Sequence, residues 1–203
     1  MTKLEFFFDC SSPWTYLGFE GLQELVDLYP ALEVTYKPIL VGGVFNAVNP
    51  SVYANRDNPV PAKQAYSQKD MQDWARLQGV KIGKPPVFPV NSVKAMRGAF
   101  VAMEEDLLVP YARRVFERYW SDLADISDVS ILTEIVRDVG LDETAFFSKI
   151  NDQTYKDKLR DATEELISRG GFGSPTMFLD GDDMYFGNDR LQLIEAKLAE
   201  LGE

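Results

Sequence analysis

The chain has 203 residues, of which 45% are hydrophobic and 12% aromatic, and its formal net charge is −11. This composition predicts a globular protein with a packed core, and the acidic charge argues against a nucleic acid or an anionic membrane surface as partner. Histidine is absent and Cys10 is the only cysteine, which excludes a Ser-His-Asp triad, a Cys-His pair, an intrachain disulfide and a Cys/His zinc site. No spacing of carboxylates suggests another metal site, so we expect no metal.

The first residues predict a buried strand. Residues 4–8 are apolar at nearly every position, as in a strand that is buried on both faces. One lysine precedes this short run, which is too little for a signal peptide, and no apolar stretch approaches the length of a membrane span. We therefore expect a cytoplasmic protein. Cys10, at the end of the strand, is either a small buried hydrophobe or a reactive thiol.

The joint between this strand and the next element is the first candidate site. Ser12 followed by Pro13 is typical of a helix N-cap with proline at the first helical position, and residues 13–29 repeat apolar side chains at helical spacing. A hydroxyl there lies beside unpaired backbone N–H groups and the positive end of the helix dipole. Ser12 could therefore hold an oxyanion or a thiolate, or could only cap the helix.

A second strand is predicted over residues 32–39, with Pro38 at its end or at a sheet edge. The order strand, helix, strand implies a parallel pair. Beyond it the chain reads as helices and loops up to about Gly170. The helical candidates are residues 71–78, 93–105, 109–120, 129–139, 143–150 and 153–169. Asp128 and Asp142 look like N-caps of two of these helices.

The last segment predicts a hairpin of strands 176–179 and 184–186 and a final helix over residues 191–201. The whole order is that of thioredoxin. The predicted fold class is α/β: a thioredoxin-like domain, residues 1–41 plus 171–203, interrupted by a helical insertion domain, residues 42–170. The order of elements suggests a cis Ser174–Pro175 bond facing the first helix, although the local sequence alone favours trans. The main chain of Ser174 would then be exposed to pair with an extended peptide.

Four motifs together carry a resemblance to a known family: Phe8–Leu17, Phe88–Ser92, Gly173–Thr176 and Phe186–Leu191. In this order they resemble the 2-hydroxychromene-2-carboxylate isomerases and their relatives, the kappa-class glutathione transferases, over nearly the whole chain. The resemblance implies a thioredoxin-like domain interrupted by a helical domain, glutathione as cofactor, and a homodimer.

The resemblance also implies roles for individual residues. Ser12 would be the catalytic serine that faces the glutathione sulfur. Ser12 and Thr15 stand where related disulfide oxidoreductases have their two cysteines, so no dithiol cycle is available. Asp189 would face the γ-glutamyl ammonium, and Lys63 would lie near the glycyl carboxylate. The full set of implied cofactor-binding residues is Ser12, Asn46, Lys63, Ser174, Pro175, Asn188 and Asp189.

Between Asp73 and Glu104 the sequence has no acidic residue but several cations, which we call the basic segment: Arg76, Lys81, Lys84, Lys94 and Arg97. For any single lysine a solvated face is the simpler interpretation. We interpret the segment as a patch that attracts an anionic substrate. The expected substrate-binding residues are Asn91, Lys94, Arg97, Trp14 and Phe88. Tyr16 and Phe45 are further candidates for an aromatic wall, or belong to the core.

The reaction that the resemblance implies is the reversible isomerisation between 2-hydroxychromene-2-carboxylate and trans-o-hydroxybenzylidenepyruvate, a step in the degradation of naphthalene-like aromatics. The glutathione thiolate would add to the conjugated double bond and leave after rotation about the resulting single bond. The partner would be a small aromatic carboxylate. Two alternatives remain: a kappa-type glutathione transferase or peroxidase, and a glutathione-binding module without turnover.

Overall fold

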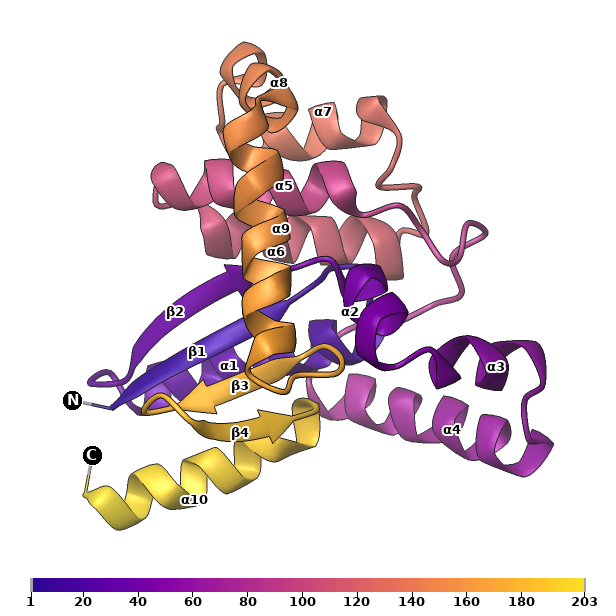
Figure 1. The fold of residues 1–203 in the computed structure, drawn as a ribbon, viewed down its shortest axis with the longest axis vertical. Coiled ribbons are helices and arrows are strands. Elements are labelled where there is room, and N and C mark those ends of the chain that lie inside the picture. The colour runs from indigo at the N-terminus through magenta and orange to yellow at the C-terminus, as the bar shows by residue number, and fades with distance from the viewer. Residues whose placement is uncertain (1, 203) are drawn as a thin grey trace.

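A four-stranded sheet forms the centre of the computed structural model, which describes residues 2–202 (Figure 1). The strand order is β2-β1-β3-β4. β1 and β2 are parallel, whereas β3 is antiparallel to both β1 and β4. The strands are β1 (Lys3–Phe8), β2 (Glu33–Pro38), β3 (Thr176–Leu179) and β4 (Asp183–Phe186). The two ends of the chain therefore build one sheet, and the predicted α/β thioredoxin-like fold is confirmed.

β1 is buried on both faces, as its unbroken apolar sequence predicts. Phe6 and Phe8 point into the larger core cluster, and Phe7 points into a smaller cluster on the opposite face with Phe178 of β3. The three phenylalanines of β1 are all 0% exposed. Full burial of one such side chain contributes about 1.5–3 kcal/mol, so this strand anchors both layers.

Helices cover both faces of the sheet. α1 and α10 contribute side chains to the larger cluster, and α2 and α9 contribute to the smaller one. The remaining helices extend away from the sheet, with α5–α8 at one end and α3 and α4 at the side (Figure 1). The α-helices are α1 (Pro13–Leu28), α2 (Val41–Val48), α3 (Ser51–Asp57), α4 (Pro61–Leu77), α5 (Val93–Glu104), α6 (Leu108–Phe116), α7 (Val129–Asp138), α8 (Glu143–Asn151), α9 (Gln153–Ser168) and α10 (Leu191–Leu201).

The strands, the hairpin and the caps agree with the predictions from sequence. The side chains of Ser12, Asp128 and Asp142 each accept a backbone N–H at the start of a helix. Sequence reasoning missed α2, α3 and residues 61–70 of α4. For α3 and α4 the reason is that α3 buries no residue and α4 buries only Ala75, so these two helices lack the apolar stripe that a periodicity search detects, whereas the short α2 buries Val41 and Val44.

The division into domains at residues 41/42 and 170/171 stays a prediction. Between β2 and β3 the described chain is helical or irregular, as expected for an insertion. α2 and α9 nevertheless pack directly on the sheet.

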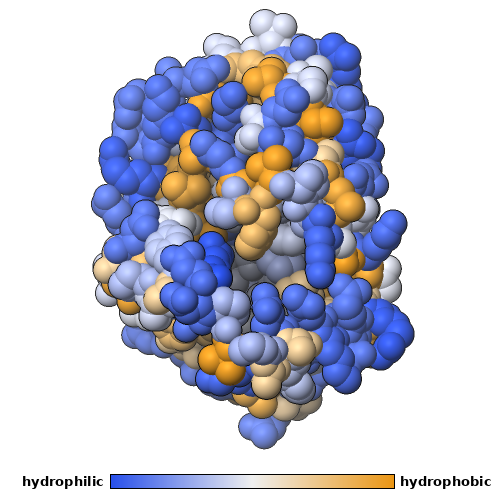
Figure 2. Space-filling model, turned by 90° about the vertical axis from the view of Figure 1, so that its right-hand side faces the viewer, coloured by the Kyte–Doolittle hydropathy of each residue, from blue (hydrophilic) through white to orange (hydrophobic). Residues whose placement is uncertain are grey.

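The face that carries α3 and α4 is mostly hydrophilic and is hollowed near its middle (Figure 2). None of the helices within residues 2–202 combines the length and apolar character that crossing a membrane requires.

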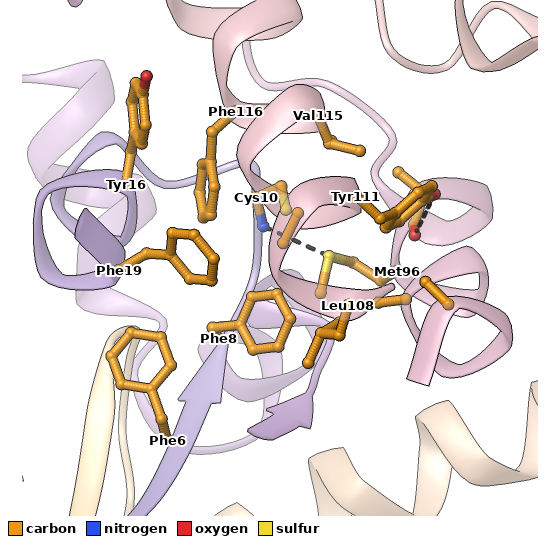
Figure 3. Close-up of a cluster of buried hydrophobic side chains, with 14 of the residues drawn as sticks. Phe6, Phe8, Cys10, Tyr16, Phe19, Met96, Leu108, Tyr111, Val115 and Phe116 are labelled. Carbon is orange, nitrogen blue, oxygen red and sulfur yellow. Dashed lines mark hydrogen bonds between the residues drawn. The ribbon is translucent and has the colours of Figure 1, made fainter. Parts of the chain in front are cut away.

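The larger cluster continues from the sheet into the helices α5 and α6, as Figure 3 shows. Tyr16 stacks on Phe116 with ring centroids 5.0 Å apart and an interplanar angle of 5°. The backbone N–H of Cys10 points at the sulfur of Met96. Cys10 is 1% exposed, and burial raises the pKa of its thiol well above the usual value. Cys10 is therefore a small buried hydrophobe and not a reactive thiol.

Candidate active site

The N-terminus of α1 lies against the segment that leads into β3. The Ser12 hydroxyl accepts the backbone N–H of Thr15 at 3.2 Å and donates to the carbonyl of Ser174 at 3.3 Å. The Ser174–Pro175 bond is cis, as the order of elements suggested. The first turn of α1 carries no acidic side chain of its own.

Ser174 connects the segment before β3 to the end of β1 and to the start of α1 through hydrogen bonds. Its hydroxyl accepts the backbone N–H of Asp9 at 3.2 Å and shares a hydrogen bond of 2.8 Å with the Thr15 hydroxyl. Ser174 is 7% exposed. In this state its carbonyl accepts the Ser12 hydroxyl, and pairing of the Ser174 main chain with an extended peptide stays a prediction.

A cavity of about 700 Å³, which we call the central cavity, opens above these residues. It is bounded by the start of α1, by α2 and α3, by the loop before α5 and by the segment before β3. The predicted residues that line it are Ser12, Trp14, Asn46, Phe88, Asn91 and Ser174, together with Phe45.

Two further cavities adjoin the central one. The lateral cavity, of about 330 Å³, shares Trp14, Ser174 and Phe186 with it and is lined by Pro175, Asn188 and Asp189. The outer cavity, of about 790 Å³, lies on the other side, between α3 and α4, and is lined by Lys63. All seven predicted cofactor-binding residues thus line one of three adjoining cavities. Their roles stay predictions.

No cation of the basic segment lines any of the three cavities. Lys94 is exposed on α5, and Arg97 donates to the carbonyl of Ile150 at the end of α8. Neither side chain lines any of the three cavities. The two residues are one helical turn apart, so they share a face of α5. Tyr16 likewise lies in the core and not in a cavity wall.

The structure brings a different cation to the site. Arg56 of α3 lines both the central and the outer cavity. Its guanidinium carbon lies 5.3 Å from the ring centre of Phe88, 5.7 Å from that of Phe45 and 5.9 Å from that of Tyr53. Sequence reasoning missed Arg56 because nothing in residues 51–57 predicted a helix. The sequence offers one weak sign that Arg56 could have a role, which is that it is the one cation between Lys37 and Lys63.

A buried carboxylate forms the floor of the central cavity. Asp9 is 0% exposed and accepts the backbone N–H groups of Ser11 and Val41, both at 2.9 Å, and the Ser92 hydroxyl at 3.1 Å. Burial raises the pKa of Asp9 above 3.8, and these hydrogen bonds oppose the shift. Asp9 therefore ties the starts of α1, α2 and α5 together. Sequence reasoning missed this role because the partners are distant in the chain.

Comparison of the sequence with known proteins identifies the family of the chain. Residues 3–199 match the DSBA-like thioredoxin domain family. A 2-hydroxychromene-2-carboxylate isomerase from Pseudomonas putida is 33% identical over 201 residues, 98% of this chain and 95% of that protein. Glutathione S-transferase kappa 1 from Rattus norvegicus is 30% identical over 210 residues, 97% of this chain and 91% of that protein.

A solved structure of a 2-hydroxychromene-2-carboxylate isomerase superposes on the chain with a TM-score of 0.82. The two are 28% identical, and the match covers 98% of this chain and 95% of that one. The chain therefore belongs to the DsbA-like thioredoxin-domain proteins, in the family that includes the 2-hydroxychromene-2-carboxylate isomerases and the kappa-class glutathione transferases.

Proposed function

We propose that this protein is a glutathione-dependent isomerase that interconverts 2-hydroxychromene-2-carboxylate and trans-o-hydroxybenzylidenepyruvate in the degradation of aromatic compounds. The observation that carries the proposal is the position of Ser12, at the N-terminus of α1, hydrogen-bonded to Ser174 where the lateral and central cavities meet. The isomerases similar to this chain over nearly its full length support the same reaction.

The residues around the cavities fit glutathione. The Asp189 carboxylate suits the γ-glutamyl ammonium, and the Ser174 carbonyl suits the cysteinyl N–H. At the other end, the Asn46 amide and the Lys63 ammonium suit the glycyl carboxylate. Asn188, which is 8% exposed, and Pro175 would border the peptide in the lateral cavity. When bound, glutathione would supply a thiolate as the nucleophile.

Ser12 would act on the sulfur through its hydroxyl. A hydrogen bond from this hydroxyl, together with the backbone N–H groups of the first turn of α1, favours the thiolate over the thiol. Neither residue 12 nor residue 15 is a cysteine, so the disulfide chemistry of the wider thioredoxin fold cannot take place at this position.

The central cavity suits a flat aromatic substrate. Trp14, Phe45 and Phe88 supply aromatic surface, and the Asn91 side chain is exposed at the same cavity and can donate to an oxygen. Aromatic side chains bind a ring through offset or edge contacts, and a single amide orients it.

The second candidate function is that of a kappa-type glutathione transferase, which the similarity to kappa-class enzymes favours. The experiment that tests the proposal is turnover of 2-hydroxychromene-2-carboxylate with a catalytic amount of glutathione. We expect many turnovers per glutathione with no loss of free thiol. Stoichiometric consumption of glutathione with a halogenated aromatic, and no isomerisation, would instead identify a transferase. Glutathione binding without either reaction would identify a binding module.

We further infer that the protein is cytoplasmic, where glutathione is available to it, and that it is a homodimer, as the family resemblance implies. Exposed leucines, among them Leu28 and Leu77, supply apolar surface that a second copy would cover. Light scattering of the purified protein tests the dimer, and a mass of one chain at micromolar concentration would contradict it.

A further inference from the structure

Arg56 occupies the boundary between the central and the outer cavity. It lies on α3, and its guanidinium is within 6 Å of the ring centres of Phe45, Tyr53 and Phe88. Two of these rings, Phe45 and Tyr53, meet edge to face at a centroid distance of 6.3 Å. Contacts with ring faces do not use the N–H groups of a guanidinium, so these groups can still donate to a ligand.

Arg56 forms no ion pair with a carboxylate of residues 2–202, although Asp57 beside it also lines the outer cavity. Within residues 2–202, no hydrogen bond or ion pair joins its guanidinium to another side chain. Among the described residues that line the central cavity, Arg56 is the one cation, and Asp9 is the one carboxylate. Asp9 is fully buried, and both of its oxygens accept hydrogen bonds from the protein. Arg56 is exposed and lines both cavities, so in a chain of net charge −11 it is available to bind an external anion.

We propose that Arg56 holds the carboxylate of the substrate and thereby sets the preference of the enzyme for aromatic acids. This inference rests on the proposed isomerase function. The planar guanidinium matches a carboxylate with two parallel hydrogen bonds, and the adjacent rings contact the aromatic part of the same molecule. Arg56 takes over the role that the sequence suggested for Lys94 and Arg97, neither of which lines the cavity.

A structural role for Arg56 makes a different prediction. If Arg56 only links α3 to the loop at Phe88 through its ring contacts, its loss would disturb the cavity wall for every ligand. The charge of the ligand would then make no difference. A pair of ligands that differ in that charge, and otherwise by one methyl group, separates the two roles: trans-o-hydroxybenzylidenepyruvate and its methyl ester.

The first measurement is the binding of this acid and its ester by titration calorimetry without glutathione, so that no turnover takes place. We expect Arg56→Gln to weaken binding of the acid by about tenfold and binding of the ester by less than about twofold. Arg56→Lys keeps the charge but loses the paired hydrogen bonds, so we expect it to recover part of the loss. Arg160→Gln removes an exposed arginine of α9 and should change neither affinity.

The second measurement is steady-state kinetics at saturating glutathione, with melting curves to check that each variant is folded. We expect Arg56→Gln to raise KM for the acid by about the same tenfold, with kcat and the dissociation constant of glutathione nearly unchanged. Equal weakening of acid and ester would overturn the inference, and so would a matching loss of glutathione affinity. If the wild type binds the acid through Arg56 but does not isomerise it, the proposed function fails and the carboxylate site remains.

Discussion

The hydroxyl of Ser12 donates its hydrogen to the main-chain carbonyl of Ser174 across 3.3 Å. A hydroxyl has one hydrogen, so this bond and a bond to a thiolate exclude each other. In the proposed complex the cysteinyl N–H of glutathione takes over the Ser174 carbonyl, and the Ser12 hydroxyl turns toward the sulfur. Binding of the peptide and activation of its thiol are thereby coupled through one rotating hydroxyl.

Ser12→Ala removes this hydroxyl and leaves the dipole of α1 in place. A hydrogen bond to a charged group is worth roughly 1.5–3 kcal/mol, so we expect kcat/KM near neutral pH to fall about ten- to a hundredfold. The pKa of bound glutathione should rise, which moves the ascending limb of the pH–rate profile upward and restores part of the activity in alkali.

The same change removes the N-cap of α1 at a cost of about 1 kcal/mol of stability. Asp142→Ala is the matched control, because it removes the side chain that caps α8 and leaves the site untouched. If Ser12→Ala keeps the full rate and the wild-type titration of glutathione, Ser12 is only a cap and the proposed mechanism is wrong.

The part of the site that could be predicted from the sequence rests on local signals. Ser12 followed by Pro13 indicates a cap, and the burial of residues 4–8 on both faces of the sheet follows from their apolar character. Arg56 and the contacts of Asp9 could not be predicted. Arg56 lies on a helix without buried residues, and Asp9 bonds to Val41 and Ser92, whose proximity only the folded chain creates.

The glycyl end of glutathione can be tested through Lys63, which lines the outer cavity. Its ammonium is exposed, so its contact with a carboxylate is worth only about 1 kcal/mol. We expect Lys63→Gln to weaken binding of glutathione roughly fivefold. Binding of γ-glutamylcysteine, which lacks the glycine, should not change. Lys156→Gln, at a half-buried lysine of α9 that lines none of the three cavities, is the control, and an equal loss for both peptides would place Lys63 elsewhere in the site.

Glu104 joins three helices through its carboxylate. It accepts hydrogen bonds from Lys158 at 2.7 Å, Tyr155 at 2.6 Å and Lys149 at 3.0 Å. The bonds from Lys158 and Tyr155 lower the pKa of Glu104 from 4.5 to about 2. Because the folded pKa is depressed, the stabilisation is present above pH 4.5 and is lost as the pH falls toward 2.

Glu104→Gln should therefore destabilise the protein at pH 7 and have little effect near pH 2. The side chain is 36% exposed, so after solvent screening we expect a loss of roughly 1 kcal/mol at pH 7. Urea unfolding at the two pH values measures this difference. Glu200→Gln, on the exposed end of α10, should leave stability unchanged, and a pH-independent effect of Glu104→Gln would contradict the argument.

Asp9→Asn tests whether the buried carboxylate holds the cavity together. Asn presents an NH₂ group to at least one of the donors on Ser11, Val41 and Ser92, and an unmatched buried donor costs about 1–3 kcal/mol. We expect a loss of that size in urea unfolding. Loosening of the starts of α1 and α5 should also raise KM for both glutathione and the aromatic acid.

The contribution of Asp9 to the free energy of unfolding should change with pH in the opposite direction to that of Glu104. Burial raises the pKa of Asp9 above 3.8, so the folded chain holds this proton more tightly than the unfolded chain does. The contribution of Asp9 is then largest below pH 3.8 and falls as the pH rises toward the elevated folded pKa. The free energy of unfolding of the wild type, minus that of Asp9→Asn, should therefore decrease with rising pH. Asp142→Asn, which replaces one exposed capping group by another, should show no such trend. A difference that instead grows with pH would mean that the hydrogen bonds to Asp9 outweigh its burial.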